Sequence, residues 1–102
     1  MHFKGITLWH KMPDGTFSRM YFEHSILTKT VTDLVNNQVN TRKTNVRLRI
    51  YTARKTDISV GDRICEGYIT NNEPTKNSYI ICSIKENFDL LVRFRHYRLD
   101  CV

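Results

Sequence analysis

A corner at Gly61 and Asp62 constrains the fold of this chain more than any other feature. Before it, Ile58 and Val60 are two positions apart, as residues on one face of a strand are, and residues 63–65 resume an extended pattern. Glycine takes a positive φ without steric cost, and an aspartate can accept hydrogen bonds from nearby backbone N–H groups. The stretch therefore predicts a strand, a tight corner and a second strand, which is typical of small closed β-structures.

Other segments alternate apolar and polar residues with the period of two that indicates strands. These segments are residues 3–10, 16–28, 46–51, 78–86 and 90–99. The turn at Pro13, Asp14 and Gly15 joins the first two as a hairpin. Because 102 residues with 40% apolar content can fill one modest core, we expect a single all-β domain over residues 1–102. Its predicted form is a small antiparallel β-barrel or sandwich of about six strands.

The alternation also predicts which side chains point inward. On the second strand the expected core face is Met20, Phe22, His24 and Ile26. In residues 78–86, Ile80, Cys82 and Ile84 share a face, so Cys82 is expected to be a small buried apolar residue. In the last strand Leu90, Val92 and Phe94 are expected opposite Arg93, Arg95 and Tyr97.

Residues 29–45 are rich in threonine and asparagine, and they predict one long polar loop between the second and third strands. Long loops within compact domains are usually functional or disordered, and both interpretations stay open. The candidate functional residues of this loop are Thr30, Thr32, Asn36, Asn37, Gln38 and Asn40.

Sixteen lysines and arginines against ten acids give a formal charge of +6, which favours acidic partners such as nucleic acid. A solvated sheet face and general solubility are the simpler explanations of the same charge. The candidate DNA-contacting residues are Arg42, Lys43, Arg47, Arg49, Arg93 and Arg95. Tyr51 and Tyr97 accompany the last four and could stack on bases.

The sequence offers no combination of nucleophile, base and stabiliser and no paired metal-ligand spacing, so we expect neither an enzyme nor a cofactor or metal site. Gly61 and Asp62 are interpreted as a structural corner. Three cysteines without CxxC spacing fit a reducing compartment, and no apolar run approaches the ~20 residues that cross a bilayer.

Taken together, four features resemble the small neck proteins of long-tailed bacteriophages, the head-closure (stopper) family, often labelled minor capsid proteins. They are the opening residues 5–10, the corner at residues 57–64 with Gly67 behind it, the stretch at residues 74–84, and the C-terminal strand.

This resemblance covers nearly the whole chain and implies a β-barrel that forms an oligomeric ring with copies of itself in the virion neck, assembled in the host cytoplasm. Such a ring lies under the portal and its adaptor protein, retains packaged double-stranded DNA, and provides the surface to which the tail attaches. The resemblance further implies that residues 29–45 project into the DNA channel. Two alternatives stay open: a tail-completion (terminator) subunit of the same neck, and a cytoplasmic nucleic-acid-binding small β-barrel.

Overall fold

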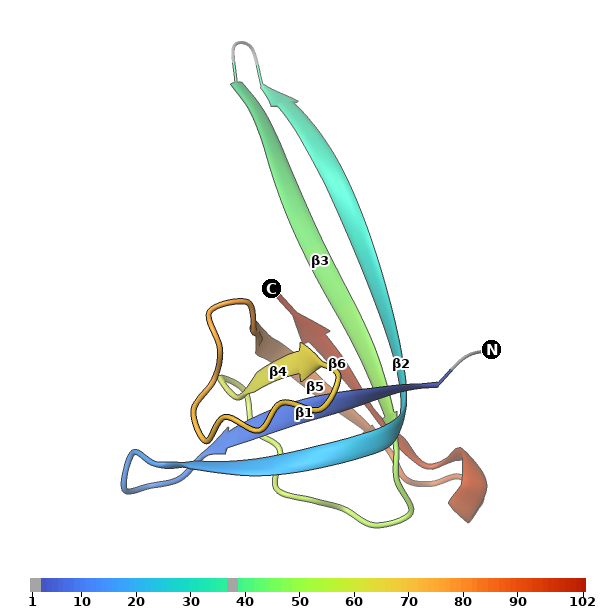
Figure 1. The fold of residues 1–102 in the computed structure, drawn as a ribbon. Coiled ribbons are helices and arrows are strands. Elements are labelled where there is room, and N and C mark those ends of the chain that lie inside the picture. The colour runs from blue at the N-terminus through green and yellow to red at the C-terminus, as the bar shows by residue number, and fades with distance from the viewer. Residues whose placement is uncertain (1–2, 37–38) are drawn as a thin grey trace.

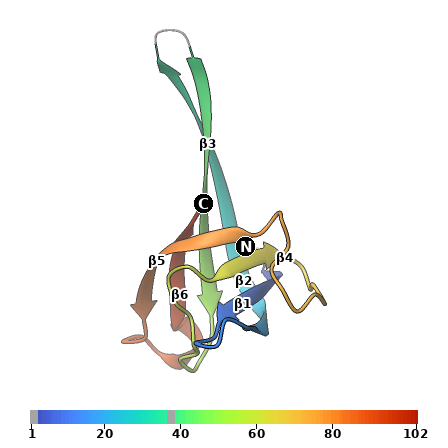
Figure 2. The ribbon, with the colours of Figure 1, turned by 90° about the vertical axis from the view of Figure 1, so that its left-hand side faces the viewer.

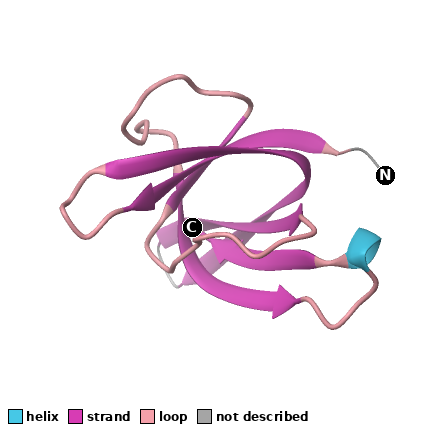
Figure 3. Cartoon of the chain, turned by 90° about the horizontal axis from the view of Figure 1, so that it is seen from below, coloured by secondary structure: helices cyan, strands magenta, loops and turns pink. Residues whose placement is uncertain are grey.

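Six strands form a closed antiparallel barrel in the computed structural model, which describes the backbone of residues 3–36 and 39–102 and the side chains of residues 3–31 and 44–102 (Figure 1). The elements are β1 (Lys4–Lys11), β2 (Phe17–Asn36), β3 (Val39–Tyr51), β4 (Arg63–Glu66), β5 (Tyr79–Asn87), the 3-10 turn η1 (Val92–Phe94) and β6 (His96–Cys101). Around the barrel the strand order is β1-β2-β3-β6-β5-β4, and the view along the barrel shows the strands enclosing a common interior (Figure 3). The predicted all-β barrel of about six strands is confirmed.

Alternating apolar side chains fill the barrel, as the period of two requires. Opposite one another on β3 and β6, Leu48 pairs with Leu99 and Ile50 with Tyr97, and all four side chains are buried. The complete buried cluster is Ile6, Leu8, Val46, Leu48, Ile50, Ile64, Ile81, Tyr97, Leu99 and Cys101.

The first hairpin forms at the predicted turn. Asp14 Oδ1 accepts hydrogen bonds from the backbone N–H of Thr16 at 3.0 Å and from its hydroxyl at 2.6 Å. Gly15 has a φ of 90°, which the absence of a Cβ permits at no steric cost. These bonds lower the pKa of the Asp14 carboxyl, chiefly through the Thr16 hydroxyl.

The corner at Gly61 and Asp62 forms, but it is not flanked by two strands. Ile58 packs against the core while Val60 is 64% exposed, and residues 52–59 contain no strand. The prediction of a strand there was wrong because two apolar residues two apart also fit a loop with a single anchoring side chain. Gly61 has a φ of 95°, and its N–H donates to the carbonyl of Ile81 at 2.8 Å.

Asp62 connects this corner to the end of β1. Its carboxylate is 2% exposed and accepts hydrogen bonds from the backbone N–H groups of Ser59 at 2.8 Å and Lys11 at 3.2 Å. His10 Nδ1 lies 2.7 Å from the same carboxylate. The corner therefore joins β1 to the beginning of β4.

Two β-bulges change which side chains face inward. Between Lys4 and Ile6 the register of β1 with β2 shifts, and after this shift Ser25 rather than His24 is buried. The placement of His24 in the core was therefore wrong. The extra residue in a bulge reverses the alternation of the strand beyond it, which a strict period of two does not anticipate.

A second register shift lies between Ile81 and Ser83 on β5. Ile81 is buried before the shift and Ile84 packs on the core after it, whereas Ile80 is 39% exposed. Cys82 lies in the bulge with an exposed side chain, so the prediction of a buried Cys82 was wrong.

The last strand begins later than predicted. Residues 90–95 form a loop that contains η1, and Leu90, Val92 and Phe94 are 46%, 56% and 47% exposed. Tyr97, which the pattern placed on an outer basic stripe, is a core residue. The Tyr97 hydroxyl donates to the carbonyl of Thr56 at 3.2 Å and accepts from its N–H at 2.9 Å.

The connection between the second and third strands is long, as expected, but its described residues are paired strands rather than an irregular loop. β2 and β3 pair continuously from Ser25 with Ile50 to Asn36 with Val39. The segment contains several threonines and valines, and these β-branched residues favour extended backbone. We call residues 30–36 and 39–45 the ribbon, and Figures 1 and 2 show it leaving the barrel as one long hairpin.

Candidate functional site

The ribbon extends beyond every other strand. In the described part of the chain, β1 stops pairing with β2 at Ser25, and β6 stops pairing with β3 at Val46. From Val46 to Val39 the β3 arm runs seven residues further, or about 24 Å at ~3.4 Å per residue. The molecule measures 48 × 34 × 23 Å along its principal axes, and the ribbon contributes to the longest of them (Figure 1).

The base of the ribbon is tied to the barrel by Lys29. Its ammonium lies 2.8 Å from Glu66 on β4 and 5.6 Å from the centre of the Tyr79 ring on β5. The hydrogen bond with Glu66 is the main cause that raises the pKa of Lys29, and the same bond lowers the pKa of Glu66. This contact joins β2 to β4 and β5 at the point where the ribbon leaves the barrel.

The predicted loop residues lie along the ribbon. Thr30 is exposed at its base, and the backbone of Thr32, Asn36 and Asn40 belongs to its two arms. Asn37 and Gln38 lie outside the described residues. Arg42 and Lys43 belong to the β3 arm by their backbone, opposite Asp33 and Thr32.

Arg47 and Arg49 point outward from β3, as the alternation predicts, and both are exposed. Arg47 is already paired, because its Nε lies 3.1 Å from Asp100 Oδ1 on β6. Asp100 also accepts a hydrogen bond from the Ser83 hydroxyl at 3.0 Å. The hydrogen bond from Arg47 is the main cause that lowers the pKa of Asp100.

Arg49 belongs to a row of three like charges that sequence analysis missed. The register places Arg49 opposite Arg98 on β6, and Arg98 opposite Lys85 on β5. We call these three residues the basic row. Lys85 and Arg98 are far apart in the sequence, and only the pairing of β5 with β6 reveals that they are neighbours.

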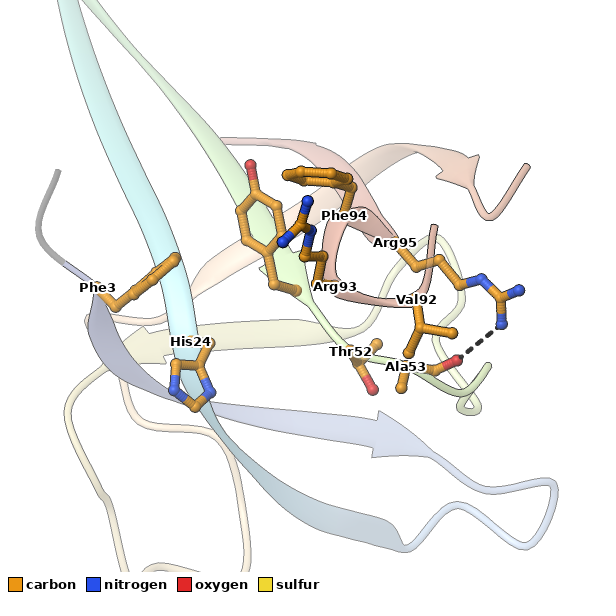
Figure 4. A pocket seen from close by; sticks show the side chains of 9 residues that line it. Phe3, His24, Thr52, Ala53, Val92, Arg93, Phe94 and Arg95 are labelled. Carbon is orange, nitrogen blue, oxygen red and sulfur yellow. Dashed lines mark hydrogen bonds between the residues drawn. The ribbon is translucent and has the colours of Figure 1, made fainter. Parts of the chain in front are cut away.

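Arg93 and Arg95 do not share a strand face with Tyr97. Arg93 lies in η1 with its guanidinium 4.8 Å from the centre of the Phe94 ring. The Arg95 side chain donates to the backbone carbonyl of Leu90 at 3.1 Å and to that of Ala53 at 3.5 Å, the latter drawn in Figure 4. Arg95 thus holds the η1 loop against the end of β3, which is a structural task.

A pocket lies between η1 and the beginning of β1, and Figure 4 shows Phe3 and His24 across from the η1 side chains. Its volume is about 510 Å³. Phe3 contacts His24 edge-on with ring centres 5.3 Å apart and Tyr51 with centres 5.7 Å apart. We call it the aromatic pocket, and its lining is Phe3, His24, Tyr51, Thr52, Ala53, Val92, Arg93, Phe94 and Arg95.

The aromatic pocket was not predictable from the sequence because its walls come from four separate segments. Phe3, His24 and Phe94 are each unremarkable in the sequence, and an alternating pattern gave Phe94 a place in the core. A possible signal was the run of four apolar residues interrupted by an arginine at residues 90–94, which is unusual for an exposed loop.

Within the described side chains, no group of three or more His, Cys, Asp or Glu residues is placed to hold a metal ion. No helix in the described residues is long and apolar enough to span a bilayer. Comparison with known proteins finds no matching family model, no matching curated protein and no matching solved structure.

Proposed function

We propose that this protein is a structural subunit of the neck that joins head and tail in a long-tailed bacteriophage, where it closes the head after DNA packaging. The observation that carries the proposal is a closed barrel from which a two-stranded ribbon projects by about 24 Å. In the proposed ring, the barrels form the wall and the ribbons reach into the channel.

The physical character of the ribbon supports an assembly role. A two-stranded hairpin is marginally stable alone in water, and its two outer edges carry unpaired N–H and C=O groups. Such edges are templates for pairing with another chain, and ribbons from neighbouring subunits of a ring are suitable partners. Assembly would thus stabilise the ribbon and close the channel in one step.

The charge of the ribbon supports contact with DNA. Along residues 30–45 there are two basic residues, Arg42 and Lys43, and one acid, Asp33, and the exposed Arg49 continues the basic character along β3. Contacts of this kind neutralise phosphates without reading sequence. The proposed partners are therefore packaged double-stranded DNA, further copies of this chain, the portal or adaptor protein, and a tail-completion protein.

Purified tailless heads filled with DNA provide the test. In heads that lack their own closure protein, we expect the packaged DNA to be accessible to DNase. Adding this protein should make the DNA resistant to DNase and leave a ring of added density at the portal end in electron micrographs. Heads that remain fully sensitive to DNase at saturating protein, with no added density, would contradict the proposal.

A further inference from the structure

We propose that the outer face of β3, β6 and β5 binds single-stranded nucleic acid, with phosphates on the basic row and an unstacked base in the aromatic pocket. This proposal narrows nucleic-acid binding to one ligand class and one site. It does not depend on the neck function, because it concerns the isolated barrel rather than an assembled ring.

The three positive charges of the basic row repel one another. Arg49, Arg98 and Lys85 lie directly opposite one another on three adjacent strands. Like charges in this position destabilise a sheet, and a bound anion relieves the repulsion. The acid of the next row, Asp100, is engaged by Arg47 and does not neutralise the basic row by a direct ion pair.

The aromatic pocket lies immediately beside the basic row. Tyr51, which lines the pocket, is two residues beyond Arg49 on the same outward face of β3, or about 7 Å along the strand. His96 lies opposite Tyr51 with ring centres 5.0 Å apart. The aromatic pair of Tyr51 and His96 therefore lies next to the basic row on one continuous surface.

The chemistry of the pocket suits a nucleobase. Its volume of about 510 Å³ is within the usual range for small-molecule sites. Phe3 and Phe94 are each about half exposed, so their rings can stack on a planar ligand. Arg93 already stacks its guanidinium on Phe94 and can extend the same stack over a base.

A single strand fits this arrangement better than a duplex. Bases in a duplex are stacked and paired, so none can enter a pocket beside the phosphates without being extruded at a cost of a few kcal/mol. Single strands present their bases freely, and proteins bind them with cationic surfaces interleaved with rings. Because stacking accepts every base, we expect little sequence preference.

Fluorescence anisotropy with a labelled oligothymidine of about 12 nucleotides tests the proposal, since sites of ~4–16 nucleotides are typical of small barrels. The full chain is titrated at several salt concentrations, and a duplex of equal length is titrated in parallel. We expect tighter binding of the single strand than of the duplex and a negative slope of log affinity against log salt.

Variants separate the two halves of the site. The double variant Arg49→Gln/Lys85→Gln should reduce the magnitude of the salt slope by roughly 1.4, at ~0.7 per phosphate contact on a single strand. The matched control Lys11→Gln/Lys76→Gln removes the same charge at exposed positions elsewhere. An equal change in slope from both pairs would overturn the assignment to the basic row.

Phe94→Ala should weaken binding roughly 5- to 100-fold without changing the salt slope, which corresponds to one lost stacking contact. Phe94→Leu keeps apolar volume but removes the ring, and it should weaken binding similarly. Leu91→Ala is the matched control, because this 68% exposed side chain lies in the same loop but outside the pocket lining.

Three results would overturn the proposal. The first is no binding of the oligonucleotide at about 50 mM salt, where phosphate contacts are strong. The second is duplex binding as tight as single-strand binding, which would show that no unstacked base enters the aromatic pocket. The third is an equal effect of Leu91→Ala and Phe94→Ala, which would show that Phe94 makes no specific stacking contact in the aromatic pocket. Thermal unfolding of each variant verifies that it is folded.

Discussion

Replacing Asp62 with alanine tests whether the corner holds the barrel closed. β4 pairs with β1 through four residue pairs and with β5 through two, so the closing seam of the barrel is short. Asp62 reinforces this seam from both sides, since its carboxylate binds Ser59 and the end of β1 while its backbone carbonyl accepts from Ile81 N–H at 2.9 Å. Only the carboxylate contacts are lost in the alanine variant.

The expected loss follows from the donors left without an acceptor. The backbone N–H groups of Ser59 and Lys11 and the imidazole of His10 would each lose the partner that Asp62 provides. A buried donor left unpaired costs about 1–3 kcal/mol. Because all three groups are only partly buried, we take the low end for each and expect Asp62→Ala to lower the free energy of unfolding by about 3 kcal/mol.

Urea denaturation followed by tryptophan fluorescence measures this loss, since Trp9 is fully buried on β1 next to the seam. A loss of about 3 kcal/mol corresponds to a decrease in melting temperature of roughly 12–24 °C for a chain of this size. Asp62→Asn, which keeps one acceptor oxygen, should lose about half as much.

Asp14→Ala is the matched control for the same residue type at an exposed turn, and we expect a clearly smaller loss than for Asp62→Ala, because water can replace the hydrogen bonds of Asp14. If Asp62→Ala and Asp14→Ala destabilise the protein equally, the reasoning about the corner is refuted.

Two further predictions concern ionisable side chains of β3, β5 and β6. The pKa of Asp100 is lowered mainly by Arg47, so the stabilisation is present above the unfolded pKa near 4 and is lost as pH falls through the lower folded value. Both side chains are about half exposed, so the effect should be below about 1 kcal/mol, and Arg47→Gln should remove most of it in unfolding curves between pH 5 and 2, leaving the smaller part due to Ser83 and Arg98. Cys82 is exposed, whereas burial raises the pKa of Cys101 to about 12, so iodoacetamide should label Cys82 in the native protein and Cys101 only after unfolding. Peptide mass mapping reads out both sites, and native labelling of Cys101 at the rate of Cys82 would contradict the burial argument.

Local patterns predicted the barrel well because its strands follow the period of two over most of their length. Val46, Leu48 and Ile50 alternate with Arg47 and Arg49 in the sequence, and β3 buries the first set and exposes the second. The turn at residues 13–15 was equally predictable, since proline, aspartate and glycine each have a defined conformational preference there.

The errors arise where one residue changes the register or where distant segments meet. The bulges near His24 and Cys82 insert one residue each, and a single insertion moves every later side chain to the other face. Residues 90–95 alternate like a strand, but the backbone carbonyls of Leu90 and Ala53 bind Arg95 and hold this segment as a loop. Such long-range contacts leave no local signal.

The candidate sites also divide into residues that one strand predicts and residues that only the folded barrel brings together. Arg47 and Arg49 were identifiable from one strand alone. The basic row and the aromatic pocket were not, because Arg98, Lys85 and Phe3 join them only through the order of strands in the closed barrel. The threonine- and asparagine-rich composition located the ribbon correctly. The asparagines led to the prediction of a loop, whereas the β-branched residues beside them favour the paired strands that form.

Removal of the ribbon tests the proposed head closure most directly. Replacing residues 30–45 with Asn-Gly joins Lys29 to Val46, which are already paired, through the two-residue turn that such hairpins favour. All residues of the buried core cluster lie outside the deleted segment, so the variant should remain folded. Its melting temperature should be within a few degrees of that of the parent protein, and circular dichroism can verify this. A scrambled ribbon of equal composition serves as the control for length and charge.

The decisive measurement is the fraction of DNA that tailless heads retain against DNase after incubation with the ribbonless variant. The proposal predicts that the variant still binds the portal end of the head but leaves the DNA as sensitive to DNase as in heads without added protein. If the bound variant protects the DNA as fully as the parent protein does, the ribbon does not close the channel and the central claim is contradicted.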